Sequence, residues 1–146
     1  MCLQVSGFDT RLFHKMYFNQ EPDTKITVYK VLYHLQYVQK YITPWRAAEA
    51  KLNSELVAFN LYDKGYNIPV KNGDQINGGV IHCWRDLKSA IEDMTCDNEV
   101  VVECTARIKD FVAIGIANDI CFTKIFVTDK ILCEWTEDLV IKQKGV

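Results

Sequence analysis

The segment from Asn77 to Met94, NGGVIHCWRDLKSAIEDM, is where side chains capable of chemistry are most concentrated. His82 and Cys83 are adjacent there, and these residue types serve as base and nucleophile in cysteine-dependent enzymes. Such a pair needs a contact of about 3 Å. Neighbouring side chains on a strand point to opposite faces, so a strand over 80–84 would keep the two apart. We therefore predict no catalytic residue here and interpret His82 as a structural, hydrogen-bonded residue.

The same segment predicts a strand that leads into a capped helix. We expect the strand at Val80–Trp84 and the helix at Leu87–Met94, with Asp86 as its N-cap. Before the strand, the Asn-Gly and Gly-Gly pairs of 67–79 predict turns, and the missing Gly-Lys-Ser/Thr run argues against a phosphate loop. The helix repeats apolar residues at a spacing typical of a buried face: Leu87, Ala90, Ile91 and Met94.

Two charged residues, Glu103 and Lys124, lie inside otherwise apolar segments, 99–106 and 120–128, which we predict as strands. If these strands pair, the two side chains could face each other as a cross-strand ion pair. Glu103 could instead lie in a cleft as an acid or as a ribose-binding carboxylate. A partly solvated sheet face is the preferred explanation, because antiparallel sheets often expose one side to water.

A helical segment is predicted near the N-terminus, at about 9–19, with Asp9 as a plausible N-cap. Its apolar residues fall on one face of the helix: Leu12, Phe13, Met16 and Tyr17. An apolar stripe of this kind is usually part of a core, so we expect the helix to pack on the domain. The alternative is a helix that binds a partner.

The middle of the chain predicts a strand and then a second helix. Residues 25–42 are rich in β-branched and aromatic types and carry large apolar groups on both faces, which favours a central strand. Tyr29 in this strand is either a substrate contact or a core ring whose hydroxyl reaches the rim. Thr43-Pro44 predicts a helix start, Gly65 a helix end, and the apolar residues between them have helical spacing: Trp45, Ala48, Leu52, Leu56 and Phe59.

Together these elements predict an α+β fold: a mainly antiparallel sheet with two or three helices packed on it. Short strands are also expected at 109–115 and 130–142. With 146 residues the chain suits a single compact domain, 1–146, which buries roughly 68% of its unfolded surface.

Composition argues against several classes of function. The net charge is −2 with no basic block, which disfavours nucleic-acid binding. The six cysteines include no Cys-x-x-Cys and the three histidines lie far apart, so we predict no metal site, no cofactor and reduced thiols. The sequence shows no secretory signal and no apolar run of about 18 residues, so we expect neither secretion nor membrane insertion.

Three segments carry a family resemblance: ITVYKVL, GGVIHCWRDLKSAIED and VVVECTARIKDFVAIG with the later FTKIFV. They resemble small uncharacterised proteins of viruses and bacteria. The first residues, LQVSGFDTRLF, are similar to the ranavirus immediate-early protein family of iridoviruses. This resemblance covers most of the chain and brings no catalytic motif. It implies a viral protein made early in infection that acts in the cytoplasm or nucleus of the host cell.

A weaker likeness is to ADP-ribosyltransferase-like folds, which combine a polar residue on an early strand, a strand before a mid-chain helix and a late glutamate. Tyr29, His82 and Glu103 occupy those places and are the candidate ligand-binding residues. The chain lacks the typical Ser-Thr-Ser strand and Glu-x-Glu pair, since Cys104 and Thr105 follow Glu103. The corresponding alternative function is a nucleotide-binding or ADP-ribosyltransferase-like module with a cleft near His82 and Glu103.

The leading expectation is a non-enzymatic protein that acts through protein–protein interaction, with a host protein or with a second copy of itself. It rests on the missing metal pattern, phosphate loop, nucleophile motif and basic face. Aromatic residues make up 12% of the chain, which is enough to supply the anchors that interfaces use.

Overall fold

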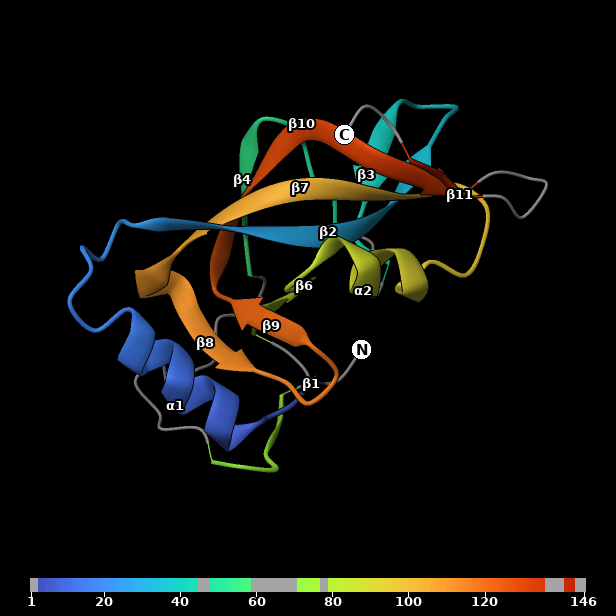
Figure 1. The fold of residues 1–146 in the computed structure, drawn as a ribbon. Helices are drawn as coiled ribbons and strands as arrows, with labels where there is room; N and C mark the ends of the chain where they lie inside the picture. Colours follow the sequence, from blue (N-terminus) through green and yellow to red (C-terminus); the bar gives the residue numbers. More distant parts are fainter. Residues whose placement is uncertain (1–2, 45–47, 59–70, 77–78, 136–140, 144–146) are drawn as a thin grey trace.

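A large antiparallel sheet forms most of the protein (Figure 1). The computed structural model describes residues 3–44, 48–58, 71–76, 79–135 and 141–143. The sheet follows the order β11-β10-β7-β2-β6-β9-β8, with β3 paired to β2 and β4 paired to β10. Its strands are β2 (Lys25–Leu35), β3 (Lys40–Ile42), β4 (Ser54–Val57), β6 (Ile81–Trp84), β7 (Glu99–Arg107), β8 (Phe111–Ile114), β9 (Asp119–Phe122), β10 (Lys124–Trp135) and β11 (Ile141–Gln143).

The other described elements are short. β1 (Leu3–Gln4) and β5 (Gln75–Ile76) form a separate antiparallel pair. The helices are α1 (Gly7–Met16), α2 (Leu87–Asp93) and a single 3-10 turn, η1 (Ile108–Asp110). The sequence-based expectation of an α+β fold with a mainly antiparallel sheet is confirmed.

The centre of the sheet is the pairing of β2 with β7, which runs over nine consecutive residue pairs from Lys25 opposite Arg107 to Tyr33 opposite Glu99. The predicted central position of this strand is confirmed. Valine side chains of β7 alternate between two cores, because neighbouring strand residues face opposite sides. Val102 enters one core and Val101 the other.

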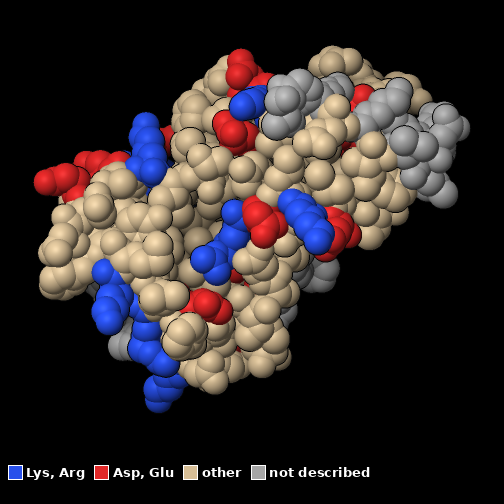
Figure 2. All heavy atoms as spheres, viewed as in Figure 1, with Lys and Arg blue, Asp and Glu red and all other residues tan. Residues whose placement is uncertain are grey.

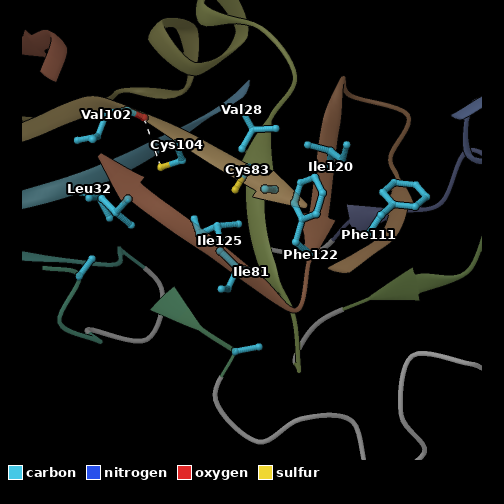
Figure 3. Close-up of a cluster of buried hydrophobic side chains, with 14 of the residues drawn as sticks. Val28, Leu32, Ile81, Cys83, Val102, Cys104, Phe111, Ile120, Phe122 and Ile125 are labelled. Atoms are coloured by element: carbon cyan, nitrogen blue, oxygen red, sulfur yellow. Dashed lines mark hydrogen bonds between the residues drawn. The ribbon is translucent and has the colours of Figure 1, made fainter. Parts of the chain in front are cut away.

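The larger core lies inside the curve of the sheet. Figure 3 shows side chains from β2, β6, β7, β9 and β10 pointing into the same interior, among them Val28, Cys83, Phe122 and Ile125. All four are almost completely buried. Residues of strands that are far apart in the sheet order can meet in this way only if the sheet curls around them. Each fully buried large apolar side chain contributes about 1.5–3 kcal/mol to the free energy of unfolding.

The second core lies between the sheet and α2. Ala90 of the helix and its C-cap, Met94, are buried against Val31 of β2 and Val101 of β7. Asp86 is the N-cap, and its side chain accepts a hydrogen bond from the Ser89 backbone N–H at 2.7 Å. The predicted strand, cap and buried helical face are therefore confirmed, with β6 starting one residue later and α2 ending one residue earlier than expected.

Helix α1 begins earlier and faces differently than the sequence suggested. Its N-cap is Ser6, not Asp9, because the Ser6 hydroxyl accepts from the Asp9 backbone N–H at 3.2 Å and donates to the Asp9 carboxylate at 2.8 Å. The helix ends at Met16 rather than near residue 19. Phe13 is buried and its ring stacks on Phe111 of β8, with centroids 4.0 Å apart.

The helix predicted from Thr43 to Gly65 is wrong over the described residues 48–58, where the chain forms β4; residues 45–47 and 59–65 lie outside the described part. Asn53 has a left-handed φ of 59°, which interrupts a helix. The first half of β10 then offers a strand edge to which Ser54–Val57 pair. Backbone pairing with β10 therefore outweighs the helical spacing of the apolar residues.

The segment 120–128 is likewise not one strand. It divides at Thr123 into β9 and β10. The Thr123 backbone N–H donates a hydrogen bond to the Asp110 carbonyl at 2.9 Å, and the Thr123 carbonyl accepts one from the Ala58 backbone N–H. The chain bends at this point, which allows β9 and β10 to occupy different parts of the sheet.

Candidate functional site

The three residues singled out from the sequence do not form one site. Tyr29 lies directly opposite Glu103 on β7 and opposite Trp84 on β6. Tyr29 also packs against the core under α2. His82 lies on β6, two positions before Trp84, and it lines a cavity that neither Tyr29 nor Glu103 lines. The sheet thus brings Tyr29 and Glu103 together and leaves His82 to a different set of neighbours.

The adjacent His82 and Cys83 face opposite sides of β6, as the alternation of a strand predicts. Cys83 is buried in the larger core, whereas His82 is half-buried. Burial raises the pKa of the Cys83 thiol to about 11, so it stays protonated near neutral pH. A protonated thiol inside an apolar core does not act as a nucleophile, and the pair cannot work as base and nucleophile.

The predicted ion pair between Glu103 and Lys124 is wrong. Glu103 lies 3.8 Å from Lys130, and Lys124 lies 3.8 Å from Glu55 of β4. The physical reason is the register of β10, which shifts between Val127 and Ile131 and carries Lys130 to the level of Glu103. The Thr128 hydroxyl donates to the Glu103 carbonyl at 2.6 Å within this irregular stretch.

The cavity beside His82 lies where β2 and β6 diverge. Those strands share one residue pair, Tyr29 opposite Trp84, although each remains paired on its other edge. Past that pair, the Lys30 ammonium reaches across and donates to the His82 carbonyl at 2.7 Å. The gap between the strands is a cavity of about 420 Å³, a size typical of sites for small molecules.

The cavity has an apolar wall and a polar end. The wall comes from β4, β6 and the chain around them: Pro44, Ala48, Leu56, Val57, Ala58, Val80 and Ile81. The polar lining comes from β2, from the end of α2, from the turn that follows and from the first residue of β7: Lys30, Tyr33, Asp93, Thr95 and Glu99. Such a combination of apolar surface and a few polar groups characterises ligand pockets.

The acidic groups of the polar end are held in place by the fold. The Glu99 carboxylate is buried and accepts from the backbone N–H groups of Thr95 and Cys96 at 2.8 and 2.9 Å. Burial raises the pKa of the Asp93 carboxyl, and the charge of Glu99 acts in the same direction, whereas a hydrogen bond from Trp84 opposes it. The hydrogen bond between Tyr33 and the Cys96 thiol, together with burial, raises the pKa of Tyr33 to about 12.

Sequence reasoning identified His82 but missed Lys30, Asp93 and Glu99 at this cavity. One signal was present: Lys30 shares a strand face with apolar residues such as Val28 and Leu32. The gap itself depends on where β2 and β6 stop pairing, and no short pattern in the sequence encodes that position.

A second feature is an apolar surface on α1. Phe8, Leu12 and Met16 are 68%, 43% and 63% exposed and follow one another at intervals of four, so they form one row along the helix. The helix buries the opposite side, through Thr10 and Phe13. The predicted stripe is therefore divided, with Leu12 and Met16 outside and Phe13 inside.

Basic side chains run beside this apolar row. Arg11 and Lys15 are exposed and lie three residues after Phe8 and Leu12, which places them on the neighbouring edge of the helix. Figure 2 shows Lys and Arg side chains gathered at the lower left, where α1 lies. Next to Leu12 and Met16 is a small pocket of about 180 Å³, also lined by Arg85. We call Phe8, Arg11, Leu12, Lys15 and Met16 the α1 surface.

The described cysteines and acidic residues do not suggest metal chemistry. Five described cysteines are free, and four of them are buried: Cys83, Cys104, Cys121 and Cys133. Within the described ranges, no three His, Cys, Asp or Glu side chains are grouped so that they could hold a metal ion. Nor does this part of the chain include a helix with the length and apolar character needed to cross a bilayer.

Comparison with known proteins adds no assignment. A scan against models of protein families gave no match, and searches among curated proteins and solved structures gave none either. The function is therefore argued from the geometry of the cavity and of the α1 surface.

Proposed function

We propose that the protein acts by protein–protein interaction. The α1 surface contacts the partner, whereas α2 packs against the sheet and stabilises the fold. The observation that carries this proposal is the row of Phe8, Leu12 and Met16, three large apolar side chains that remain exposed on an ordered helix. Single exposed apolar residues are ordinary, whereas a contiguous group marks an interaction site.

The charge of the α1 surface indicates the chemistry of the partner. Arg11 and Lys15 border the apolar row, and the only carboxylate of α1, Asp9, is bonded to the Ser6 hydroxyl. An acidic amphipathic helix would place apolar side chains on the row and carboxylates next to the two basic residues. The small pocket beside Leu12 and Met16 would receive one apolar side chain of that helix.

A designed peptide tests this proposal without knowledge of the natural partner. The probe is a labelled acidic helix of Leu and Glu repeats, compared with the same helix carrying Lys in place of Glu. We expect the acidic peptide to bind the full chain and the basic peptide to bind much more weakly. Met16→Glu should weaken binding of the acidic peptide about ten-fold or more, because it places a like charge within the apolar row, at its C-terminal end.

The matched control is Ile116→Glu, since Ile116 is 65% exposed and Met16 63% exposed. Equal binding by both variants, or no preference for the acidic peptide, would refute the proposal. Sedimentation of the protein alone tests whether a second copy of the chain binds to the α1 surface. Co-sedimentation with anionic vesicles tests whether a lipid surface does. Binding through α1 in either of these assays, without binding of the acidic peptide, would also refute it.

The likeness to the ranavirus immediate-early family stays a proposal of its own. It would make the partner a host protein in the cytoplasm or nucleus. The nucleotide-binding or ADP-ribosyltransferase-like alternative has one observation in its favour, the cavity beside His82. Against it, Tyr29 and Glu103 do not line that cavity, and its charged groups include two carboxylates.

A further inference from the structure

The cavity between β2 and β6 passes between two strands rather than lying on one face of the sheet. Lys30 and Val31 are consecutive on β2 and therefore point to opposite faces, yet both line it. The same holds for Ile81 and His82 on β6. A molecule in this gap would contact the edges of both strands and the chain around β4.

The charged groups at the polar end do not balance. Asp93 and Glu99 carry two carboxylates, whereas Lys30 carries one ammonium, and that ammonium is already bonded to the His82 carbonyl. Two aromatic residues, Trp84 and Tyr33, line the same cavity. Carboxylates and aromatic faces both attract cations, and an ammonium group would restore the balance of charge.

We propose that this cavity binds an organic cation, an amine with an apolar body. The ammonium group lies at the end formed by Asp93 and Glu99, and the apolar body lies along Leu56, Ala58 and Ile81. Burial, with a smaller contribution from the charge of Glu99, raises the pKa of the Asp93 carboxyl, so an ammonium group placed beside it would stabilise its charged form. A phosphate-bearing ligand would meet the same two carboxylates and be repelled.

Three probes that share a phenyl body test the head group: 2-phenylethylamine, 2-phenylethanol and 3-phenylpropanoate. The full chain is titrated with each at pH 7, and binding is measured by calorimetry and by the shift in Tm. We expect the amine to bind at least about ten-fold more tightly than the alcohol, because its ammonium group can form a charge-assisted hydrogen bond with a carboxylate of the cavity. The carboxylate should bind most weakly of the three.

Two variants locate the site. Asp93→Asn should remove the advantage of the amine and leave the affinity for the alcohol unchanged. The control is Asp97→Asn, an exposed carboxylate near the cavity that does not line it, which should bind the amine as the unaltered protein does. If Asp93→Asn does not fold, Ala48→Leu serves instead, because added carbons in the wall should weaken the amine and the alcohol alike.

Several results would overturn the inference. The first is tighter binding of 3-phenylpropanoate than of 2-phenylethylamine, and the second is stabilisation by ATP or NAD instead of the amine. The others are an equal loss of amine binding in Asp93→Asn and Asp97→Asn, and no binding of any probe. The Met16→Glu variant should bind the amine normally, so failure of the α1 proposal and failure of this one are separable.

Discussion

The N-cap of α2 offers the sharpest test of the fold around the cavity. Asp86 accepts a hydrogen bond from the Ser89 N–H at 2.7 Å, and its other oxygen accepts one from the Asn118 side chain in the β8–β9 turn. Asp86→Ala removes both contacts. Loss of an aspartate cap costs about 1 kcal/mol, within a range of about 0.5–2. Because Asp86 is exposed, the contact with Asn118 should add little to this.

That loss corresponds to a decrease in Tm of roughly 2–5 °C for a domain of this size. Thermal and urea unfolding, followed by circular dichroism at pH 7, measure it directly. Asp86→Asn is the matched control, since an asparagine side chain also accepts the Ser89 N–H and is as good a cap as aspartate. We expect the free energy of unfolding to fall less than half as much in Asp86→Asn as in Asp86→Ala.

The pH dependence gives an independent check. The hydrogen bond from the Ser89 backbone is the main cause that lowers the pKa of Asp86 below its ordinary value of 3.8. A carboxylate whose pKa is lower in the folded state stabilises that state above its unfolded pKa, and the effect is lost as the pH falls through the folded pKa. The difference in stability between the unaltered chain and Asp86→Ala should therefore shrink in acid. A constant difference from pH 7 down to pH 2, or an equal loss in Asp86→Asn, would refute the reasoning.

Three further predictions concern the core. Phe122→Ala should lower the free energy of unfolding by about 3–5 kcal/mol in urea titrations, because the ring is fully buried. Gly115→Ala should cost about 1–3 kcal/mol in the same assay, since the new methyl group would collide with the Asp119 carboxylate and contact Leu3; an unchanged midpoint would show that the neighbours move aside. In native protein a thiol reagent should label the peptide that contains the exposed Cys96 long before the peptide that contains Cys83, and Cys96→Ser should remove the first label, whereas rapid labelling of Cys83 would contradict its burial.

The parts of the fold that were predicted from sequence are those fixed by local chemistry. The strand, cap and helix from Ile81 to Asp93 could be predicted because Asp86 is a strong cap and the apolar spacing is regular. The run of Val100, Val101 and Val102 likewise predicted the strand that β7 forms. Each of these signals lies within a few residues of the element that it specifies.

The errors arose where distant segments compete for the same residues. Ala48, Leu52 and Leu56 have helical spacing, but the edge of β10 supplies backbone partners that β4 uses instead. The face that α1 buries depends on Phe111 from β8, so the sequence around Phe13 could not show that Leu12 remains outside.

The candidate site was predicted only in part for the same reason. His82 could be named because it stands beside Cys83 in the sequence. Lys30, Asp93 and Glu99 meet at the cavity only because β2 and β6 separate after one pair, and this depends on how the whole sheet twists. The charge of the cavity is thus a property of strand register rather than of any one motif.

The pairing of β2 with β7 also has a consequence for how the chain is made. Residue 33 pairs with residue 99 and residue 25 with residue 107, so the paired positions are 66 to 82 residues apart. At the rate of synthesis in cells, the ribosome needs on the order of 3 to 16 seconds to add that length. During this interval the β2–β3 hairpin can form, but Val28 and Leu32 have no core to enter. The nascent chain must keep these apolar side chains shielded until β7 emerges, and a chaperone would help most during this interval.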